Sequence, residues 1–184
     1  MIRVPTFAVL TLTLGLLPLS AAEVPLGDDG LHKPDWLKDS FKVLAEDNAE
    51  AAEAGRHLLL MIEQRGCIYC KRLHTEVLVD PRVESLIRSD FDVIQIDLFG
   101  ATEITDLDGE VLSEKRAAGK WGATVTPTLL ILPQEPPEGA DAARAALAMV
   151  PGVLDADDMI ALLDWAKAGG EPATGRPLGE VIGQ

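Results

Sequence analysis

Three short, largely apolar runs set the architecture of this chain. They occupy residues 57–62, 93–98 and 128–132, and polar residues bound each of them. Runs of this length are typical of strands buried inside a sheet. A fourth run, at 146–150, is a further candidate strand. Because segments of helical pattern separate most of these runs, the sequence predicts an α/β domain.

The segments between the strands carry apolar residues at helical spacing and have recognisable ends. Asp80, followed by Pro81, and Ser113 are candidate N-caps, whereas Gly55 and Gly169 follow helix ends. The segments expected to be helical are 35–54, 67–79, 80–89, 112–121 and 155–168. The segments expected to be irregular are a loose leader at 23–33, a polar connector at 100–109, a surface loop at 134–140 and a tail at 169–184.

The first 22 residues have the organisation of a secretory signal. A positive start ending at Arg3 precedes a mainly apolar stretch to Leu19, and Ala21 and Ala22 are small residues at a suitable cleavage site. The apolar stretch is shorter than the roughly 20 residues that a membrane span needs. We therefore expect a signal peptide at 1–22, cleaved near Ala22, and a periplasmic protein; an uncleaved anchor is the alternative. Cleavage leaves 162 residues, enough for one domain with its own core.

The chain is strongly acidic. It holds 30 Asp and Glu against 16 Lys and Arg, a net charge of −14. Nucleic-acid binding requires clustered Lys and Arg, so the composition disfavours that class of function. The acidity fits a soluble protein, with a basic partner surface as a further possibility.

Cys67 and Cys70 are the only cysteines in the chain, and two residues separate them. A crosslink that closes so short a loop stabilises little, because the entropy of loop closure grows with loop length. The pair is therefore better suited to cycle between dithiol and disulfide than to act as a structural crosslink. Export would bring it into an oxidising compartment, where disulfide chemistry occurs.

The position of the pair assigns different roles to the two sulfurs. Both follow a predicted buried strand at the start of a predicted helix, where free N–H groups and the helix dipole stabilise a thiolate. In such motifs the pKa of the nucleophilic cysteine falls from about 8.5 to about 3.5–7.5. We expect Cys67 to attack and Cys70, one turn inside the helix, to resolve the mixed disulfide. Lys71 and Arg72 add positive charge nearby.

A second motif is Val125-Thr126-Pro127-Thr128, directly before the third strand. Proline cannot donate a hydrogen bond to a neighbouring strand, so Pro127 belongs at a strand start or edge. A cis Thr126–Pro127 bond would leave the backbone of Thr126 free to pair with an extended substrate beside Cys67. The sequence pattern does not decide between cis and trans.

Together the two motifs resemble the thioredoxin superfamily, with Pro127 at its cis-proline position. Over residues 56–168 the chain is also similar to the exported thioredoxins of sulfur oxidation, the SoxW type. The stretches that carry this closer resemblance are 91–97, Asp80-Pro81 with Val83, and Ser113-Glu114-Lys115 ahead of Trp121-Gly122.

The resemblance implies a thioredoxin-like fold, with a central mixed sheet of four to five strands flanked by helices. It implies reduction of protein disulfides without a cofactor or metal, by a monomer. Its implied partners are client protein disulfides, including the sulfur carrier of the Sox system, and a membrane thiol transporter of the CcdA or DsbD type as electron donor. Thr126, Pro127, Tyr69 and Ile68 fall on substrate-contacting positions, although Tyr69 could equally fill the site's surface.

The chain departs from the family pattern at several positions. The buried acid of the superfamily falls on Met61, which leaves Glu63 as the nearest substitute, and Gly66 stands where cytosolic thioredoxins have tryptophan. Tyr69 and the Thr126-Pro127 pair are closer to disulfide isomerases of the DsbC type and to glutaredoxins. Residues 23–55 leave no room for the dimerisation domain of such an isomerase.

Two other classes of function stay open. The first is an oxidant or isomerase of disulfide formation, because the direction of exchange depends on the reduction potential. The second is a non-catalytic or metal-holding dithiol. Zinc needs four ligands, and His74, four residues after Cys70, is expected to be a solvated helix residue or a modest modulator of the thiol pKa. Residues 106–109 have a faint calcium-loop pattern and are expected to form a polar turn.

Overall fold

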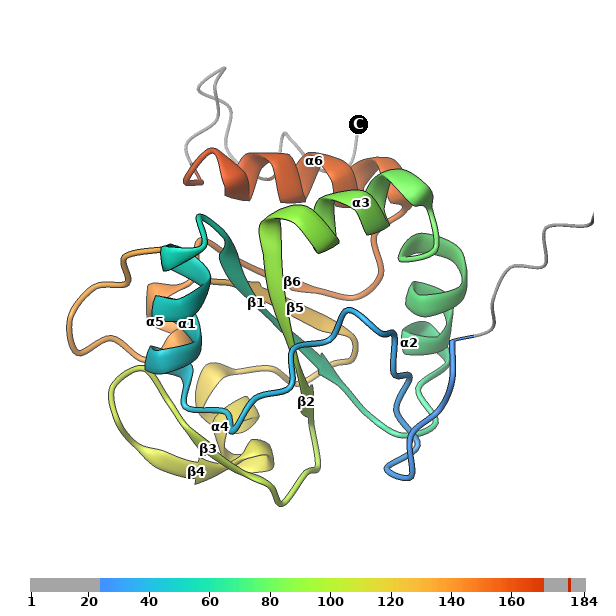
Figure 1. Cartoon of the computed structure of the whole chain (residues 1–184). Helices are drawn as coiled ribbons and strands as arrows, with labels where there is room; N and C mark the ends of the chain where they lie inside the picture. Colours follow the sequence, from blue (N-terminus) through green and yellow to red (C-terminus); the bar gives the residue numbers. More distant parts are fainter. Residues whose placement is uncertain (1–23, 171–178, 180–184) are drawn as a thin grey trace, which may run out of the picture.

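A four-stranded mixed sheet forms the centre of the molecule (Figure 1), which is described by a computed structural model over residues 24–170 and residue 179. The strand order is β2-β1-β5-β6. β1 pairs in parallel with β2, and the other two pairings are antiparallel. The strands are β1 (His57–Glu63), β2 (Phe91–Asp97), β5 (Thr128–Ile131) and β6 (Ala148–Pro151). The predicted α/β fold with a mixed central sheet is confirmed.

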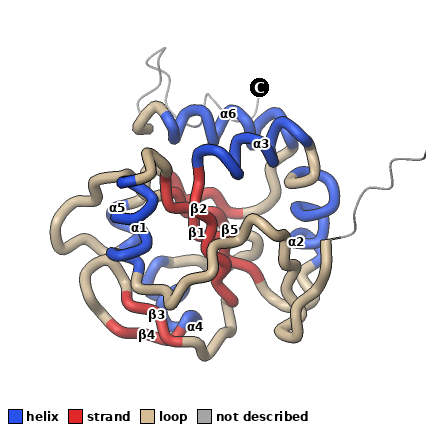
Figure 2. The backbone as a smooth tube through the Cα atoms, viewed as in Figure 1, coloured by secondary structure: helices blue, strands red, loops and turns tan. Residues whose placement is uncertain are grey.

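Helices cover both faces of this sheet (Figure 2), and the alternation of side chains along β1 divides the core accordingly. Leu58 and Leu60 point into one core cluster, and Leu59 and Met61 point into the other. The first face carries α1 (Leu44–Glu53), α4 (Glu114–Trp121) and α5 (Ala142–Ala145). The second carries α2 (Ile68–Arg72), its π-helical continuation η1 (Leu73–Val77), α3 (Pro81–Asp90) and α6 (Ala156–Lys167).

The prediction of a helix at 35–54 is wrong for its first part, because α1 begins only at Leu44. Leu37 instead forms an isolated parallel bridge with Val93 of β2, and the Lys38 N–H donates to the Val93 carbonyl at 2.8 Å. Lys42 has a φ of 60°, which no α-helix contains. The apolar residues at 36 and 37 are thus partly buried against the sheet and its core cluster, and this burial mimics helical periodicity in the sequence.

The polar connector expected at 100–109 contains a strand that the sequence pattern did not indicate. β3 (Glu103–Thr105) pairs with β4 (Val111–Ser113), so the helix expected at 112–121 begins at Glu114. Ser113 caps it as predicted, its hydroxyl accepting the N–H of Arg116. Residues 106–109 form the turn between these strands.

The carboxylate of Asp106 organises that turn. It is fully buried, accepts the indole N–H of Trp121 at 2.9 Å and forms an ion pair with Lys120. Its other oxygen accepts the N–H of Ala142 at the start of α5, a short helix that the sequence analysis missed. The acidic residues of the turn therefore bind a lysine and backbone groups.

The expected signal peptide and most of the expected tail lie outside the described residues. None of the helices in the described part is long and apolar enough to cross a membrane.

Candidate functional site

A short turn connects β1 to α2 and places Cys67 directly before the helix. Gly66 has a φ of 72°, in the left-handed region that side chains disfavour. The Cys67 N–H donates to the Gln64 carbonyl at 3.3 Å and closes the turn. Cys67 is the N-cap of α2, as the predicted helix start requires.

The two cysteines form a disulfide, with their Cα atoms 5.2 Å apart. Cys70 is buried, with 2% of its surface exposed, whereas Cys67 is partly exposed. The Sγ of Cys67 accepts the N–H of Cys70 at 3.0 Å. Because an attacking sulfur must be accessible, this asymmetry supports the predicted division of roles between the two residues.

Thr126 is distant from Cys67 in the sequence but contacts its sulfur in the structure. Its hydroxyl donates to the Cys67 Sγ at 3.3 Å, and its carbonyl oxygen lies 3.5 Å from the same sulfur. The Thr126–Pro127 bond is cis, and Pro127 directly precedes β5. The structure thus brings the two sequence motifs together at a single atom, the Cys67 sulfur.

Exposed apolar side chains flank the disulfide. Ile68 is 75% exposed, Tyr69 56% and Val125 49%. Pro127 itself is buried, and its carbonyl accepts the N–H of Gly152 at 2.8 Å. Of the predicted substrate contacts, Ile68 and Tyr69 are therefore surface groups next to the sulfurs, whereas Pro127 is buried.

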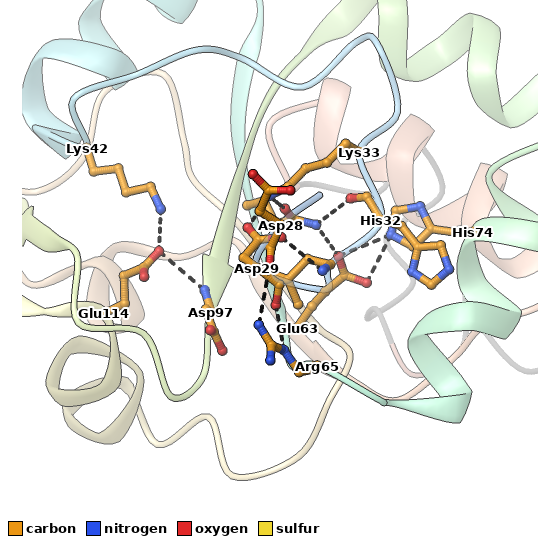
Figure 3. A network of polar contacts seen from close by, with 12 residues as sticks. Asp28, Asp29, His32, Lys33, Lys42, Glu63, Arg65, His74, Asp97 and Glu114 are labelled. Atoms are coloured by element: carbon orange, nitrogen blue, oxygen red, sulfur yellow. Dashed lines mark hydrogen bonds and ion pairs between the residues drawn. The ribbon is translucent and has the colours of Figure 1, made fainter. Parts of the chain in front are cut away.

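A buried polar network lies on the face of β1 that α2 and η1 cover (Figure 3). The Nε2 atom of His74 lies 3.0 and 3.1 Å from the two carboxylate oxygens of Glu63. The Gln95 amide donates to Glu63 at 2.6 Å. His32 stacks on His74, with ring centroids 4.7 Å apart. A buried carboxylate needs such partners, because unpaired burial of a charge is costly.

The expectation of a solvated His74 is wrong, since none of its surface is exposed. It lies in η1 between the core residues Leu73 and Val77, facing the sheet. Glu63 follows Met61 by two residues on β1, so the two side chains share a face of the sheet. Met61 therefore replaces the buried acid of the superfamily, and Glu63 supplies a buried carboxylate at the next position on the same face. From the sequence, Glu63 was only a substitute candidate.

The N-terminal segment belongs to this network, although it was expected to be loose. Leu26 and His32 form an antiparallel bridge, and Arg65 donates to the Asp29 carbonyl at 2.9 Å. Lys33 donates to the Gln95 side chain at 2.6 Å. Burial, followed by electrostatic interaction with His74 and Lys71, lowers the pKa of His32, and the nearby Glu63 opposes this shift. The lowered pKa favours the uncharged form of His32, the ring that stacks on His74.

The site's residues offer no metal-binding set in the part of the chain that the structure describes. No group of three or more His, Cys, Asp and Glu side chains there could hold a metal ion. His74 is bound to Glu63, and His57 Nδ1 lies 3.0 Å from the Leu132 carbonyl. The arrangement is chemically that of a dithiol–disulfide couple with one accessible sulfur.

Comparison with known proteins agrees with the fold. The family model described as a thioredoxin-like domain matches residues 44–167, about two thirds of the chain. A thioredoxin from Thermus thermophilus is similar in structure, with 22% identity and a TM-score of 0.52, over 72% of this chain and 88% of that one. A thioredoxin-fold protein from Helicobacter pylori has 16% identity and a TM-score of 0.51, over 82% of this chain and 81% of that one. No curated protein matches the sequence.

Proposed function

The chain belongs to the family of thioredoxin-like domains, and from that premise we propose that it is an exported reductant of protein disulfides. The family and the cysteine pair indicate a thiol:disulfide oxidoreductase. The single observation that carries the proposal is the asymmetry of the pair at the Cys67 sulfur. One sulfur is accessible and hydrogen-bonded by Thr126 and by the Cys70 N–H, and the other is buried one turn along the helix.

The reduced protein would act in two displacement steps. In the first, the Cys67 thiolate attacks one sulfur of the client disulfide, forms a mixed disulfide and releases the other client sulfur as a thiolate, which takes up a proton. In the second, the Cys70 thiolate attacks the Cys67 Sγ and releases the remaining client thiol. Two electrons and two protons pass to the client, and the Cys67–Cys70 disulfide is left.

The hydrogen bonds seen at Cys67 support the first of these steps. The Cys70 N–H and the Thr126 hydroxyl both point at the sulfur that must carry negative charge. Hydrogen bonds to a charged acceptor are stronger than those to a neutral one, so the thiolate gains more from them than the thiol does. Ile68, Tyr69 and Val125 offer the client an exposed apolar surface beside the reacting sulfur.

We propose a periplasmic location, a monomer and a membrane thiol transporter of the CcdA or DsbD type as electron donor. The apolar N-terminus of the sequence supports export, and the resemblance to SoxW-type thioredoxins supports sulfur oxidation as the physiological setting. Fractionation of cells that express the full chain, with N-terminal sequencing of the product, tests export and cleavage near Ala22.

Substitution of each cysteine tests the mechanism. Cys67→Ser should abolish the reduction of insulin disulfides, and Cys70→Ser should accumulate mixed disulfides on Cys67 that mass spectrometry identifies. Unchanged insulin reduction by Cys67→Ser, or mixed disulfides formed through Cys70, would contradict the roles assigned. A redox titration tests the direction: a potential near about −270 mV agrees with a reductant, whereas one near about −120 mV indicates an oxidant.

A further inference from the structure

A cavity of about 250 Å³ opens beside Cys67. The leader forms one wall through Val24, Leu26 and His32, next to α2 (Figure 1, dark blue). The opposite wall consists of Gln64, Cys67, Ile68, Lys71 and Thr75. Because Cys67 is part of the lining, a group in this cavity would lie near the client sulfur that Cys67 attacks.

The described residues that line the cavity include no acidic residue, although the protein as a whole is acidic. The chain holds 30 acidic residues, yet no carboxylate lines the cavity. Its one permanently charged lining group is Lys71, which forms no ion pair within the described residues. By contrast, the neighbouring Arg72 is paired with Glu76 at 2.8 Å. Of the acids near the cavity, Glu63 is buried and bound to His74 and Gln95. Asp29 is paired with Lys33 at 2.6 Å.

The size of the cavity limits what can enter it. Pockets for drug-sized ligands hold about 300–1,000 Å³, so this one suits a single side chain or a group of similar size. Val24, Leu26 and Ile68 provide apolar contacts for an aliphatic stem, and Lys71 provides a counter-charge for its end. His32 and Gln64 add hydrogen-bonding groups.

We propose that this cavity is a subsite for a carboxylate that the substrate carries next to the sulfur that Cys67 attacks. The proposal rests on the proposed function and adds a substrate class to it. Two sources share this chemistry: an acidic residue beside a cysteine of a protein client, and the carboxylate of a small disulfide such as glutathione disulfide. A charge pair at about 4 Å in water, such as a solvent-exposed pair, changes a rate by about fivefold or less.

Matched peptides test the subsite. Three peptides are closed by the same internal disulfide and differ only in having Glu, Gln or Lys next to the first cysteine. The rate constant of their reduction is measured with fully reduced protein at low salt. We expect the glutamate peptide to react about two- to fivefold faster than the glutamine peptide, and the lysine peptide to react most slowly. High salt should remove the difference.

Substitutions at Lys71 assign the preference to the cavity. Lys71→Gln should bring the ratio of the glutamate to the glutamine peptide close to one, and Lys71→Arg should preserve it. Arg72→Gln is the matched control, because it removes the neighbouring positive charge outside the lining, and it should also preserve the ratio. Any general change in the nucleophilicity of Cys67 cancels in this ratio.

The possible outcomes distinguish the proposed subsite from the proposed reductase activity. Equal rates for the three peptides, or a loss of preference in Arg72→Gln as large as in Lys71→Gln, would overturn the subsite and leave the reductase intact. Reduction of none of the peptides would overturn the reductase itself. Glutathione disulfide and the carboxylate-free cystamine distinguish the two sources. If Lys71→Gln slows the reduction of glutathione disulfide but not that of cystamine, the subsite serves small disulfides as well as protein clients.

Discussion

Replacement of Glu63 by leucine should destabilise the protein by about 3–5 kcal/mol, the usual cost of removing one partner of a buried polar pair. Glu63 is 1% exposed, and its carboxylate accepts the Gln95 amide at 2.6 Å and lies 3.0 Å from His74 Nε2. Leucine has a similar size and removes both contacts. Each buried donor left without an acceptor costs about 1–3 kcal/mol, so the two together give a similar figure.

The surroundings of His74 favour the upper part of this range of stability loss. Its Nδ1 atom is buried and has no hydrogen-bond partner within the described residues. With Glu63 removed, both of its ring nitrogens would be buried without an acceptor or donor. A loss of this size is a large part of the 5–15 kcal/mol by which typical domains are stable.

Denaturant unfolding of the oxidised protein at neutral pH measures the effect. Glu63→Gln is the intermediate variant, because the amide keeps a hydrogen-bonding oxygen, and it should lose less stability than Glu63→Leu. Glu76→Gln is the control: its exposed pair with Arg72 should be worth less than about 1 kcal/mol. A loss below about 1 kcal/mol for Glu63→Leu would show that the network does not stabilise the fold, and would refute the reasoning.

Two further predictions concern the turn before Cys67 and the histidine stack. Gly66→Ala should cost about 1–2 kcal/mol in denaturant unfolding, because φ there is 72°, although no atom lies within 4 Å of an added Cβ; an unchanged midpoint would contradict this. Burial lowers the pKa of His32 in the folded protein, so its contribution to stability is complete above its unfolded value of about 6.5 and is lost as pH falls below it. The wild type should therefore lose more stability than His32→Phe between about pH 7 and 5, and parallel pH profiles would exclude His32 as the cause.

The sheet could be predicted from the sequence because its strands are short, largely apolar and separated by helical segments. Long-range pairing could not be predicted in the same way. Leu37 is partly buried beside its bridge to Val93, and Thr105 of β3 forms a bridge with Val43; in both cases the partner is distant in sequence. Local periodicity reports which residues are buried, whereas it does not report which segment buries them.

The residues of the site also differ in whether the sequence could predict them. The cysteine pair and Thr126-Pro127 carry their chemistry in the residue types themselves, and could be found from the sequence. His74 could not be placed, because its burial depends on a carboxylate eleven residues earlier and on a ring from the leader. A histidine flanked by Leu73 and followed by Val77 was the available signal that it faces the core.

The leader is therefore part of the site, although it lies before the residues that the family model matches. It covers His74 with the His32 ring, and it supplies Val24 and Leu26 to the cavity beside Cys67. Deletion of the leader would uncover the buried network and open the cavity together, so a change in substrate choice would have two causes. Lys71 belongs to α2 and takes no part in the Glu63–His74 contact, so its substitution changes the charge of the cavity and leaves the network in place. If substrate preference responds to Lys71 while stability responds to Glu63, the cavity and the buried network that the leader borders have separable purposes, one in recognition and one in folding.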